Sequence, residues 1–389
     1  MFFSAKSITQ SFPEPQLSLT EFETKESLRP LNCVKKNLPD TLDEMVQDIN
    51  TAVMQEDKGG YRQINKSLNI CAFEDYLQGQ TTNLPKLPNV EQLTPRVLRI
   101  LGQNPGKFTY QGTNTYVIGT GTHRLIVDTS GGEPAWAELI SSTLESMGVS
   151  LSHVLLTHWH GDHTGGVPDL LRLYPHLEGS IYKNEPDKGQ QNITDGQVFR
   201  VEGATIRAVH APGHSEDHMC FVLEEEQAMF TGDNILGHGT SAVEDLGIFM
   251  ASLQKMYMQN CPVGFSAHGV TITDLPAKLK KELDGKLRRE RQVMQALGRA
   301  RTRGEKSITI QGLVTEIYGE ALEETTRTLA LEPFIDEVLR KLAGDCRVAF
   351  EIRGGKKKWY SVEAMPQNAG GLMPGPMTAS RADARVQVM

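Results

Sequence analysis

The chain has 389 residues, of which 39% are hydrophobic and 23% are charged, and its net charge is −8 at pH 7. This length predicts a main domain of roughly 200 to 250 residues with smaller additions. The acidic balance argues against a nucleic-acid-binding protein, and no apolar stretch reaches the roughly 18 residues of a membrane span. Five scattered cysteines without a Cys-x-x-Cys pair favour a reducing compartment. We therefore expect a cytoplasmic protein with neither a nucleic-acid nor a membrane partner.

Residues 1–58 are rich in Ser, Thr, Pro, Glu and Lys, and we expect an extension of doubtful order there. Residues 59–274 alternate short β-type runs, Gly-rich turns and helical patterns. The β-type runs are Thr115–Ile118, Leu125–Asp128, Val154–Thr157, Thr205–Val209, Met219–Leu223 and Ala228–Thr231. The helical patterns are Tyr61–Leu77, Pro134–Met147, Pro168–Tyr174 and Ile248–Met258. This mixture predicts a layered α/β sandwich.

The sequence changes character after residue 272. A highly charged helical stretch at Leu275–Arg303 precedes two more helical patterns, at Ser307–Gly319 and Leu322–Leu342. Two β-like runs then flank Gly354 and Gly355. We predict that residues 275–362 form a small winged-helix-like cap of three helices and a hairpin. Residues 363–389 are dominated by Pro, Gly, Ala and Met without periodicity, which predicts a disordered tail.

The most informative segment contains the pattern His-x-His-x-Asp-His. His158 and His160 leave the end of an apolar strand, and Asp162 and His163 follow in a tight turn bounded by glycines. Imidazole nitrogens and carboxylate oxygens suit Zn²⁺, Mn²⁺ or Fe²⁺, and no nearby cysteine is available to close a structural zinc site. The segment therefore predicts a metal site that is open to substrate.

Three later segments each place a further candidate ligand after a strand and a small residue: His214, Asp233 and His268. A metal-binding side chain at a strand end is held rigidly, and small neighbours leave room for substrate. Together with the first cluster, these residues resemble the sequence motifs of the metallo-β-lactamase superfamily. One departure is Ser266-Ala267 before His268, where most relatives have Pro-Gly.

The resemblance implies an αββα sandwich over residues 59–274 and two divalent metal ions, Zn²⁺ with Mn²⁺ as the alternative. The implied ligands are His158, His160 and His214 for one metal, Asp162, His163 and His268 for the other, and Asp233 as the bridge. Asp128 matches the superfamily's Asp that would accept a hydrogen bond from a ligand imidazole. Asp162 and Asp233 are the candidate catalytic carboxylates.

Two metal ions about 3.5 to 4 Å apart activate a water molecule and stabilise an oxyanion, and no Gly-x-Ser-x-Gly elbow competes with them. The sequence therefore predicts a metal-dependent hydrolase. The metals alone leave thioester, lactam, phosphodiester and lactone substrates open. A thioester is chemically attractive because a thiolate, with a pKa of about 8.5, leaves with little help from an acid.

Four segments carry a closer resemblance: Gly60–Lys66, Asn69–Tyr76, Gln111–Tyr116 and Gly232–Thr240. They look like the metallo-β-lactamase-type thioesterases of fungal polyketide pathways, in particular the atrochrysone carboxyl acyl-carrier-protein thioesterase group. The likeness covers about residues 59–362. It implies that the chain hydrolyses the thioester between an aromatic polyketide and the acyl carrier protein of a non-reducing polyketide synthase, releasing the polyketide acid for secondary metabolism. Asn114 and His238 are further candidates for contacts with the metal ligands or the substrate.

Residues 278–306 contain eleven Lys or Arg and four Asp or Glu, a net charge of +7 in a chain whose total is −8. This asymmetry suggests docking of an acidic partner, such as the carrier protein, near Arg288, Arg289 and Arg291. A solvated helix face is the alternative. Two other functions stay open: a lactamase-like endoribonuclease whose basic stretch contacts phosphate, and a glyoxalase-II-type hydrolase of small thioesters.

Overall fold

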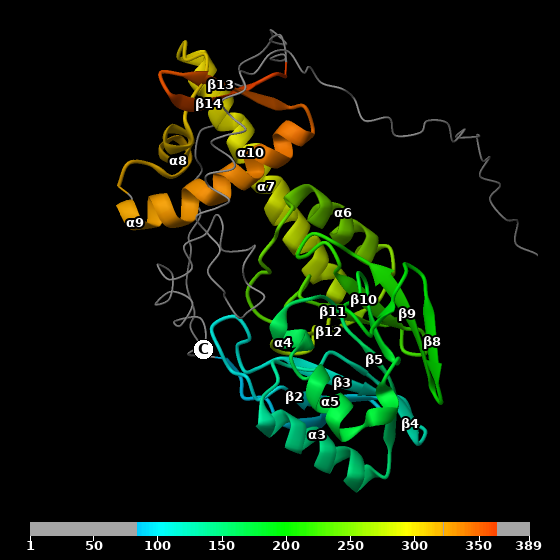
Figure 1. Cartoon of the computed structure of the whole chain (residues 1–389). Coiled ribbons are helices and arrows are strands. Elements are labelled where there is room, and N and C mark those ends of the chain that lie inside the picture. Colours follow the sequence, from blue (N-terminus) through cyan, green and yellow to red (C-terminus); the bar gives the residue numbers. More distant parts are fainter. Residues whose placement is uncertain (1–83, 322, 364–389) are drawn as a thin grey trace, which may run out of the picture. The chain divides into compact units, whose positions relative to one another are not determined.

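The computed structural model describes residues 84–321 and 323–363. The extension predicted for residues 1–58, the helix predicted at Tyr61–Leu77 and all but the first residue of the tail predicted for residues 363–389 lie outside these residues. The described part of the chain folds into two large β-sheets, flanking helices and a C-terminal group of helices with a hairpin (Figure 1).

The first sheet has seven strands in the order β1-β2-β3-β4-β5-β6-β7. They are β1 (Val90–Gln92), β2 (Val97–Leu101), β3 (Asn114–Ile118), β4 (His123–Val127), β5 (Ser150–Leu155), β6 (Ile181–Lys183) and β7 (Gln191–Asn192). Neighbouring strands from β1 to β4 are antiparallel, whereas those from β4 to β7 are parallel. The intervening helices are α3 (Pro134–Met147), α4 (Gly161–Thr164), α5 (Val167–Leu173) and the 3₁₀ turn η3 (Pro175–Leu177).

The second sheet has five strands in the order β12-β11-β10-β9-β8. They are β8 (Val198–Val201), β9 (Ala204–His210), β10 (Met219–Leu223), β11 (Ala228–Gly232) and β12 (Val263–Ser266). The strands from β8 to β11 form an antiparallel meander, and β12 pairs parallel with β11. The helix α6 (Leu246–Tyr257) makes the crossover between β11 and β12.

Successive residues of a strand point to opposite faces of the sheet, and in these strands both faces carry apolar side chains. One face of each sheet therefore packs on the other sheet. In β3, Tyr116 and Ile118 face the core between the sheets, whereas Val117 faces the helices α3 and α5. In β10, Phe221 faces the same central core, whereas Val222 packs towards α6. Each sheet therefore has a helical layer on its outer face (Figure 1), and the predicted αββα sandwich is confirmed.

The C-terminal part contains the long helix α7 (Leu275–Thr302), α8 (Ile310–Tyr318), α9 (Glu324–Thr326), the π-helical turn η4 (Arg327–Leu331), α10 (Glu332–Gly344) and a hairpin of β13 (Val348–Arg353) and β14 (Lys356–Ser361). Its core joins α7, α8 and α10 to the buried Trp359 of the hairpin. The first turns of α7 pack instead on the second sheet, through Leu275 and Leu279. The cap that we propose for residues 275–362 thus shares its first helix with the domain proposed for residues 59–274.

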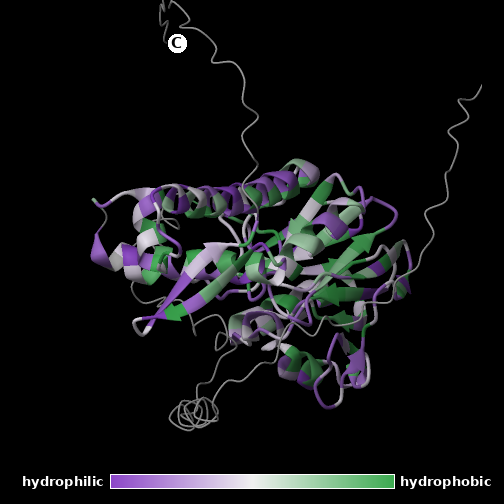
Figure 2. Ribbon diagram, turned by 90° about the horizontal axis from the view of Figure 1, so that it is seen from above, coloured by the Kyte–Doolittle hydropathy of each residue, from purple (hydrophilic) through white to green (hydrophobic). Residues whose placement is uncertain are grey.

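The long periodic segments were predicted well, whereas several short strands were not. α3 has the predicted bounds, and α5 and α6 begin within two residues of theirs. Five strands were not predicted, β1, β2, β6, β7 and β8, and three of them are only two or three residues long. Figure 2 shows the strands of the two large sheets as mainly hydrophobic, while the helices combine hydrophilic and hydrophobic faces. No helix within residues 84–321 and 323–363 is both long and apolar enough to cross a membrane.

Candidate metal centre

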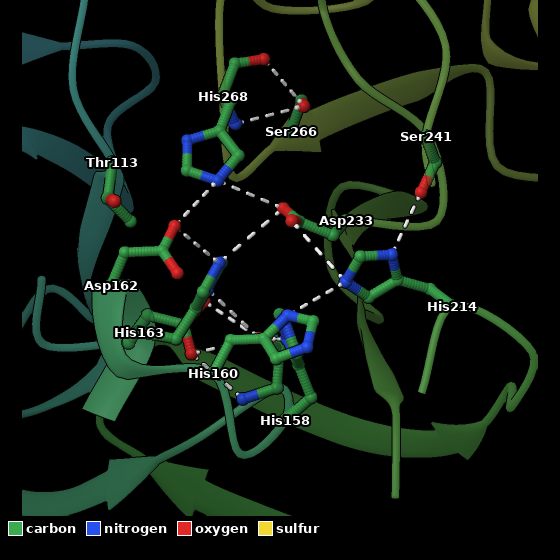
Figure 3. A network of polar contacts seen from close by, with 12 residues as sticks. Thr113, His158, His160, Asp162, His163, His214, Asp233, Ser241, Ser266 and His268 are labelled. Carbon is green, nitrogen blue, oxygen red and sulfur yellow. Dashed lines mark hydrogen bonds and ion pairs between the residues drawn. The ribbon is translucent and has the colours of Figure 1, made fainter. Parts of the chain in front are cut away.

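The candidate ligands all follow the carboxyl ends of strands. His158 and His160 come after β5, Asp233 directly follows β11, and His268 lies two residues beyond β12. Gly232, just before Asp233, has a φ of 51°, and a Cβ there would lie 2.5 Å from Nε2 of His218. Only glycine fits this approach, which brings the end of β11 close to the other ligands (Figure 3).

Three histidines and one carboxylate form the first cluster. Nδ1 of His160 lies 2.8 Å from Nε2 of His158 and 3.1 Å from Nε2 of His214. Nε2 of His214 lies 3.6 Å from Oδ2 of Asp233. One ligand atom from each of these four residues lies within 4.8 Å of every other, and all four residues are buried.

The second cluster contains Asp162, His163 and His268. Nε2 of His268 lies 3.2 Å from Oδ2 of Asp162 and 3.2 Å from Oδ1 of Asp233. Nε2 of His163 lies 3.3 Å and 3.5 Å from the same two oxygens. Asp233 thus presents Oδ1 to this cluster and Oδ2 to the first cluster, so it lies between them (Figure 3).

The spacing of these atoms fits divalent cations. In tetrahedral zinc coordination with Zn–N bonds of 2.0 to 2.1 Å, neighbouring ligand atoms are about 3.3 to 3.4 Å apart. Most contacts within the two clusters lie between 3.1 and 3.6 Å. In addition, Nε2 of His163 and Oδ1 of Asp233 are buried without a hydrogen-bond partner, which is costly unless a cation satisfies them. Both clusters are therefore compatible with a divalent metal site.

Hydrogen bonds on the far sides of the rings orient the ligand nitrogens. Nδ1 of His163 donates to Oδ2 of Asp128 at 2.8 Å, and Nδ1 of His214 donates to the carbonyl oxygen of Ala242 at 2.8 Å. Each of these bonds holds a proton on Nδ1, so that Nε2 is the nitrogen that faces the cluster. The residue predicted to accept from a ligand imidazole, Asp128, thus contacts His163.

The electrostatics differ between the two clusters. Burial, together with the neighbouring His214, lowers the pKa of His160 to about 3, and burial also lowers the pKa of His158 and His214. These imidazoles therefore stay neutral at pH 7 and keep their lone pairs for a cation. Burial alone would lower the pKa of His268 too, but Asp233 and Asp162 outweigh it and raise this pKa to about 9.

The carboxylates of the second cluster stay ionised. Burial favours the neutral form of Asp162 and Asp233, but the adjacent imidazoles lower the pKa of both carboxyls below the usual range. The same carboxylates raise the pKa of His163 well above its usual value, against the effect of burial. A cation entering this cluster would displace the imidazole protons, so its affinity would rise with pH.

The other predicted site residues occupy different positions. Nδ2 of Asn114 donates to the carbonyl oxygens of Ser266 and Gly269, each at 2.9 Å, and so braces the turn that carries His268. The hydroxyl of Ser266 accepts from the N–H of Gly237 and contacts the backbone of His268. This hydroxyl therefore organises the turn that carries His268. His238 is half-buried, and its ring is 6.3 Å from that of Tyr110.

One supporting residue, His218, lies outside the ligand motifs of the sequence. His218 is fully buried, and its Nε2 accepts a hydrogen bond from the N–H of Asp233 at 3.0 Å. Burial lowers the pKa of His218 far below its usual value, so it is neutral and able to accept. It therefore fixes the backbone of Asp233. Its position four residues after His214 was the only sequence feature that could have pointed to this supporting role.

Comparison with known proteins agrees with this geometry. The profile described as "Metallo-beta-lactamase superfamily" matches residues 109–267. An atrochrysone carboxyl ACP thioesterase from Claviceps purpurea is 76% identical over 310 residues, which cover 80% of this chain and all of the relative. A thioesterase of the same name from Passalora fulva is 62% identical over 329 residues, covering 84% of this chain and 98% of the relative.

Among solved structures, a β-lactamase domain protein from Burkholderia ambifaria matches with a TM-score of 0.57 and 17% identity. The match covers 71% of this chain and 95% of that protein, so it supports the fold. The fungal relatives are similar over nearly their whole length at far higher identity. The chain therefore belongs to the metallo-β-lactamase superfamily and, within it, to the family of these fungal relatives.

Proposed function

We propose that this chain is a metal-dependent thioesterase that releases an aromatic polyketide acid from the acyl carrier protein of a non-reducing polyketide synthase. The observation that carries the proposal is the pair of His and Asp clusters sharing Asp233, in a chain 76% identical to an atrochrysone carboxyl ACP thioesterase over that protein's full length. The cysteine pattern supports a cytoplasmic location.

Seven side chains would hold two divalent cations, Zn²⁺ or Mn²⁺. His158, His160 and His214 would hold one, and Asp162, His163 and His268 would hold the other. Asp233 would bridge them, because its two carboxylate oxygens face different clusters. The neutral state of the three-histidine cluster and the ionised state of the carboxylates support this assignment.

When bound, such a pair of cations lowers the pKa of a water molecule and polarises a carbonyl oxygen. The protein's own contribution is to hold the ligands and to handle a proton. Oδ1 of Asp162 is buried without a hydrogen-bond partner, so it is available to orient an attacking water and accept its proton. Burial of the imidazoles keeps bulk water from competing inside the centre.

A thioester suits this centre because the leaving thiolate is a weak base. Its conjugate acid has a pKa of about 8.5, so expulsion needs little protonation by the enzyme. An amide would require a strong acid next to the leaving nitrogen. The ionisable groups of the two clusters are either ionised carboxylates or imidazoles placed as ligands, which supports thioester over amide hydrolysis.

Reconstitution with a non-reducing polyketide synthase tests the proposal. The synthase, loaded with its polyketide, is incubated with the full chain, and the released acid is quantified by mass spectrometry. We expect release that a chelator abolishes and that Zn²⁺ or Mn²⁺ restores. Asp233→Asn should abolish release even with metal, whereas Asp169→Asn on the surface of α5 should leave release unchanged. Failure of the wild-type chain to release product would contradict the proposal.

Two parallel substrates separate the alternatives. A glutathione thioester hydrolysed as fast as the carrier-bound polyketide would favour a glyoxalase-II-type activity. Chelator-sensitive cleavage of RNA would favour an endoribonuclease, and its binding would weaken steeply with salt. Slow hydrolysis of the glutathione thioester and intact RNA are the results that we expect.

A further inference from the structure

Some cations of α7 take part in packing and others face outward, a difference that the sequence could not show. Lys286 is buried, with Nζ 5.4 Å from the centre of the Phe249 ring, and the guanidinium of Arg289 lies 4.0 Å from the centre of the Phe334 ring. These cation–π contacts hold α7 against α6 and α10. Arg289 is therefore part of the packing, and only the outward-facing cations are available to a partner.

Three of the outward-facing cations, Lys281, Arg288 and Arg291, form what we call the α7 basic face. All three side chains are exposed, and within residues 84–321 and 323–363 none of them has an ion-pair partner. They lie seven and three residues apart, so they share one side of the helix over a rise of about 15 Å. Other exposed cations nearby are already neutralised, as in the pair of Lys280 with Asp284 at 2.9 Å.

The N-terminal end of α7 reaches the loop beside the metal centre. Nζ of Lys278 donates to the carbonyl oxygen of Gly239 at 3.2 Å, next to His238. Lys278 also acts on His238 electrostatically: burial first, and then this ammonium, lower the pKa of that imidazole. From Lys278, the helix rises about 15 Å to Arg288. The α7 basic face is thus within a few helical turns of the centre, a separation that a flexible prosthetic arm could bridge.

We propose that the α7 basic face binds an acidic surface of the carrier protein that presents the acyl thioester. The inference rests on the proposed function and adds to it the place of docking. Charge complementarity favours a protein occupant: the three cations of the α7 basic face form a short strip in a chain whose net charge is −8. Nucleic-acid binding generally needs a larger set of phosphate contacts and a basic domain.

Two triple variants of the full chain test the docking surface. One carries Lys281→Glu, Arg288→Glu and Arg291→Glu, and reverses the α7 basic face. The matched control carries Lys188→Glu, Arg200→Glu and Arg353→Glu, exposed positions on other elements, and has the same net charge. The kcat and KM of each are measured with the polyketide on the synthase's carrier protein and with a small N-acetylcysteamine thioester of the same acyl group.

We expect reversal of the α7 basic face to raise KM for carrier-bound substrate about tenfold or more, with kcat nearly unchanged. The small thioester should be hydrolysed as by wild type, and the control variant should behave as wild type on both substrates. The tenfold difference should shrink at about 0.5 M salt, where exposed charges are screened. Replacement of the three residues by the other cation, as Lys281→Arg, Arg288→Lys and Arg291→Lys, should preserve KM.

Several results would overturn the docking proposal. They are an unchanged KM for carrier-bound substrate, an equal rise in KM in the control variant, and a rise that the cation-preserving variant shares. Wild-type binding of a labelled poly-uridine RNA that is lost on reversal, with no change in KM for the carrier, would assign the face to nucleic acid instead. A wild-type chain that hydrolyses neither thioester would overturn the proposed function itself, which is a distinct outcome.

Discussion

Replacement of Asp128 by Asn should selectively weaken the second metal cluster. Asp128 follows β4 with a φ of 61°, a left-handed conformation that Asn tolerates, so the backbone should be preserved. Oδ1 of Asp128 accepts from the N–H of Thr157 at 2.8 Å, and Oδ2 accepts from Nδ1 of His163 at 2.8 Å. Asn can keep the first bond with its oxygen, but its amide group then faces His163 with N–H donors.

Two donors facing each other are unfavourable, so the neutral imidazole of His163, the form that binds a metal, should hold its proton not on Nδ1 but on Nε2. That nitrogen faces the carboxylates of Asp162 and Asp233, where a metal would bind. Loss of such a supporting partner costs about 10- to 100-fold in metal affinity. This factor corresponds to about 1.4 to 2.7 kcal/mol. The metal-free protein should also lose about 1.5 to 3 kcal/mol of stability, because the lost hydrogen bond is charge-assisted and buried.

Titration of the metal-free protein with Zn²⁺ against a chromophoric chelator measures the effect. We expect two bound equivalents in wild type, and in Asp128→Asn one equivalent of unchanged affinity and one that is about 10- to 100-fold weaker. The control is Asp169→Asn, since that carboxylate pairs with Arg172 on the surface of α5. If Asp128→Asn bound both equivalents as wild type does, the orienting role of Asp128 would be refuted.

Three further changes probe packing and pH dependence. Arg289→Ala should lower the free energy of unfolding by about 1 to 2 kcal/mol, because the stacking on Phe334 is lost; an unchanged urea midpoint would contradict this. Lys183→Met should lower the free energy of unfolding by about 3 to 5 kcal/mol in the same assay, because it leaves Asp217 buried without its cation. The double variant Lys183→Met with Asp217→Leu should recover most of this loss. Burial and neighbouring carboxylates raise the pKa of Glu244 to about 7, so the folded state favours the protonated form of this side chain. The free energy of unfolding should therefore fall as the pH rises from about 4.5 towards 7. Glu244→Gln should therefore unfold at higher urea than wild type at pH 8, with a gain that shrinks as the pH falls to 4.5; a gain of equal size at both pH values would count against the shifted pKa.

Local sequence patterns predicted many of the helices and strands of this protein. Short β-type runs predicted β3 and β10, and a helical pattern predicted α3 from Pro134 to Met147. The ends of α3 fit this prediction, because proline suits the first turn of a helix and Gly148 its left-handed end. The chemical types of the seven candidate ligands, and their positions after strands, were also readable. These features depend on neighbours in the chain, so the sequence determines them by itself.

The tertiary structure alone decided which atoms meet. The contact of His163 with Asp128, 35 residues away, depends on the pairing of β4 with β5 in the first sheet. The contact of His160 with His214, 54 residues away, depends on how the two sheets stack. The structure also shows that the adjacent residues Arg288 and Arg289 have different surroundings. Adjacent residues of a helix point about 100° apart, and only the packing of α7 on its neighbours determines that Arg289 turns inward while Arg288 stays in solvent. Short strands such as β7 escaped prediction for the same reason, since neighbouring strands hold them in place rather than a pattern of their own.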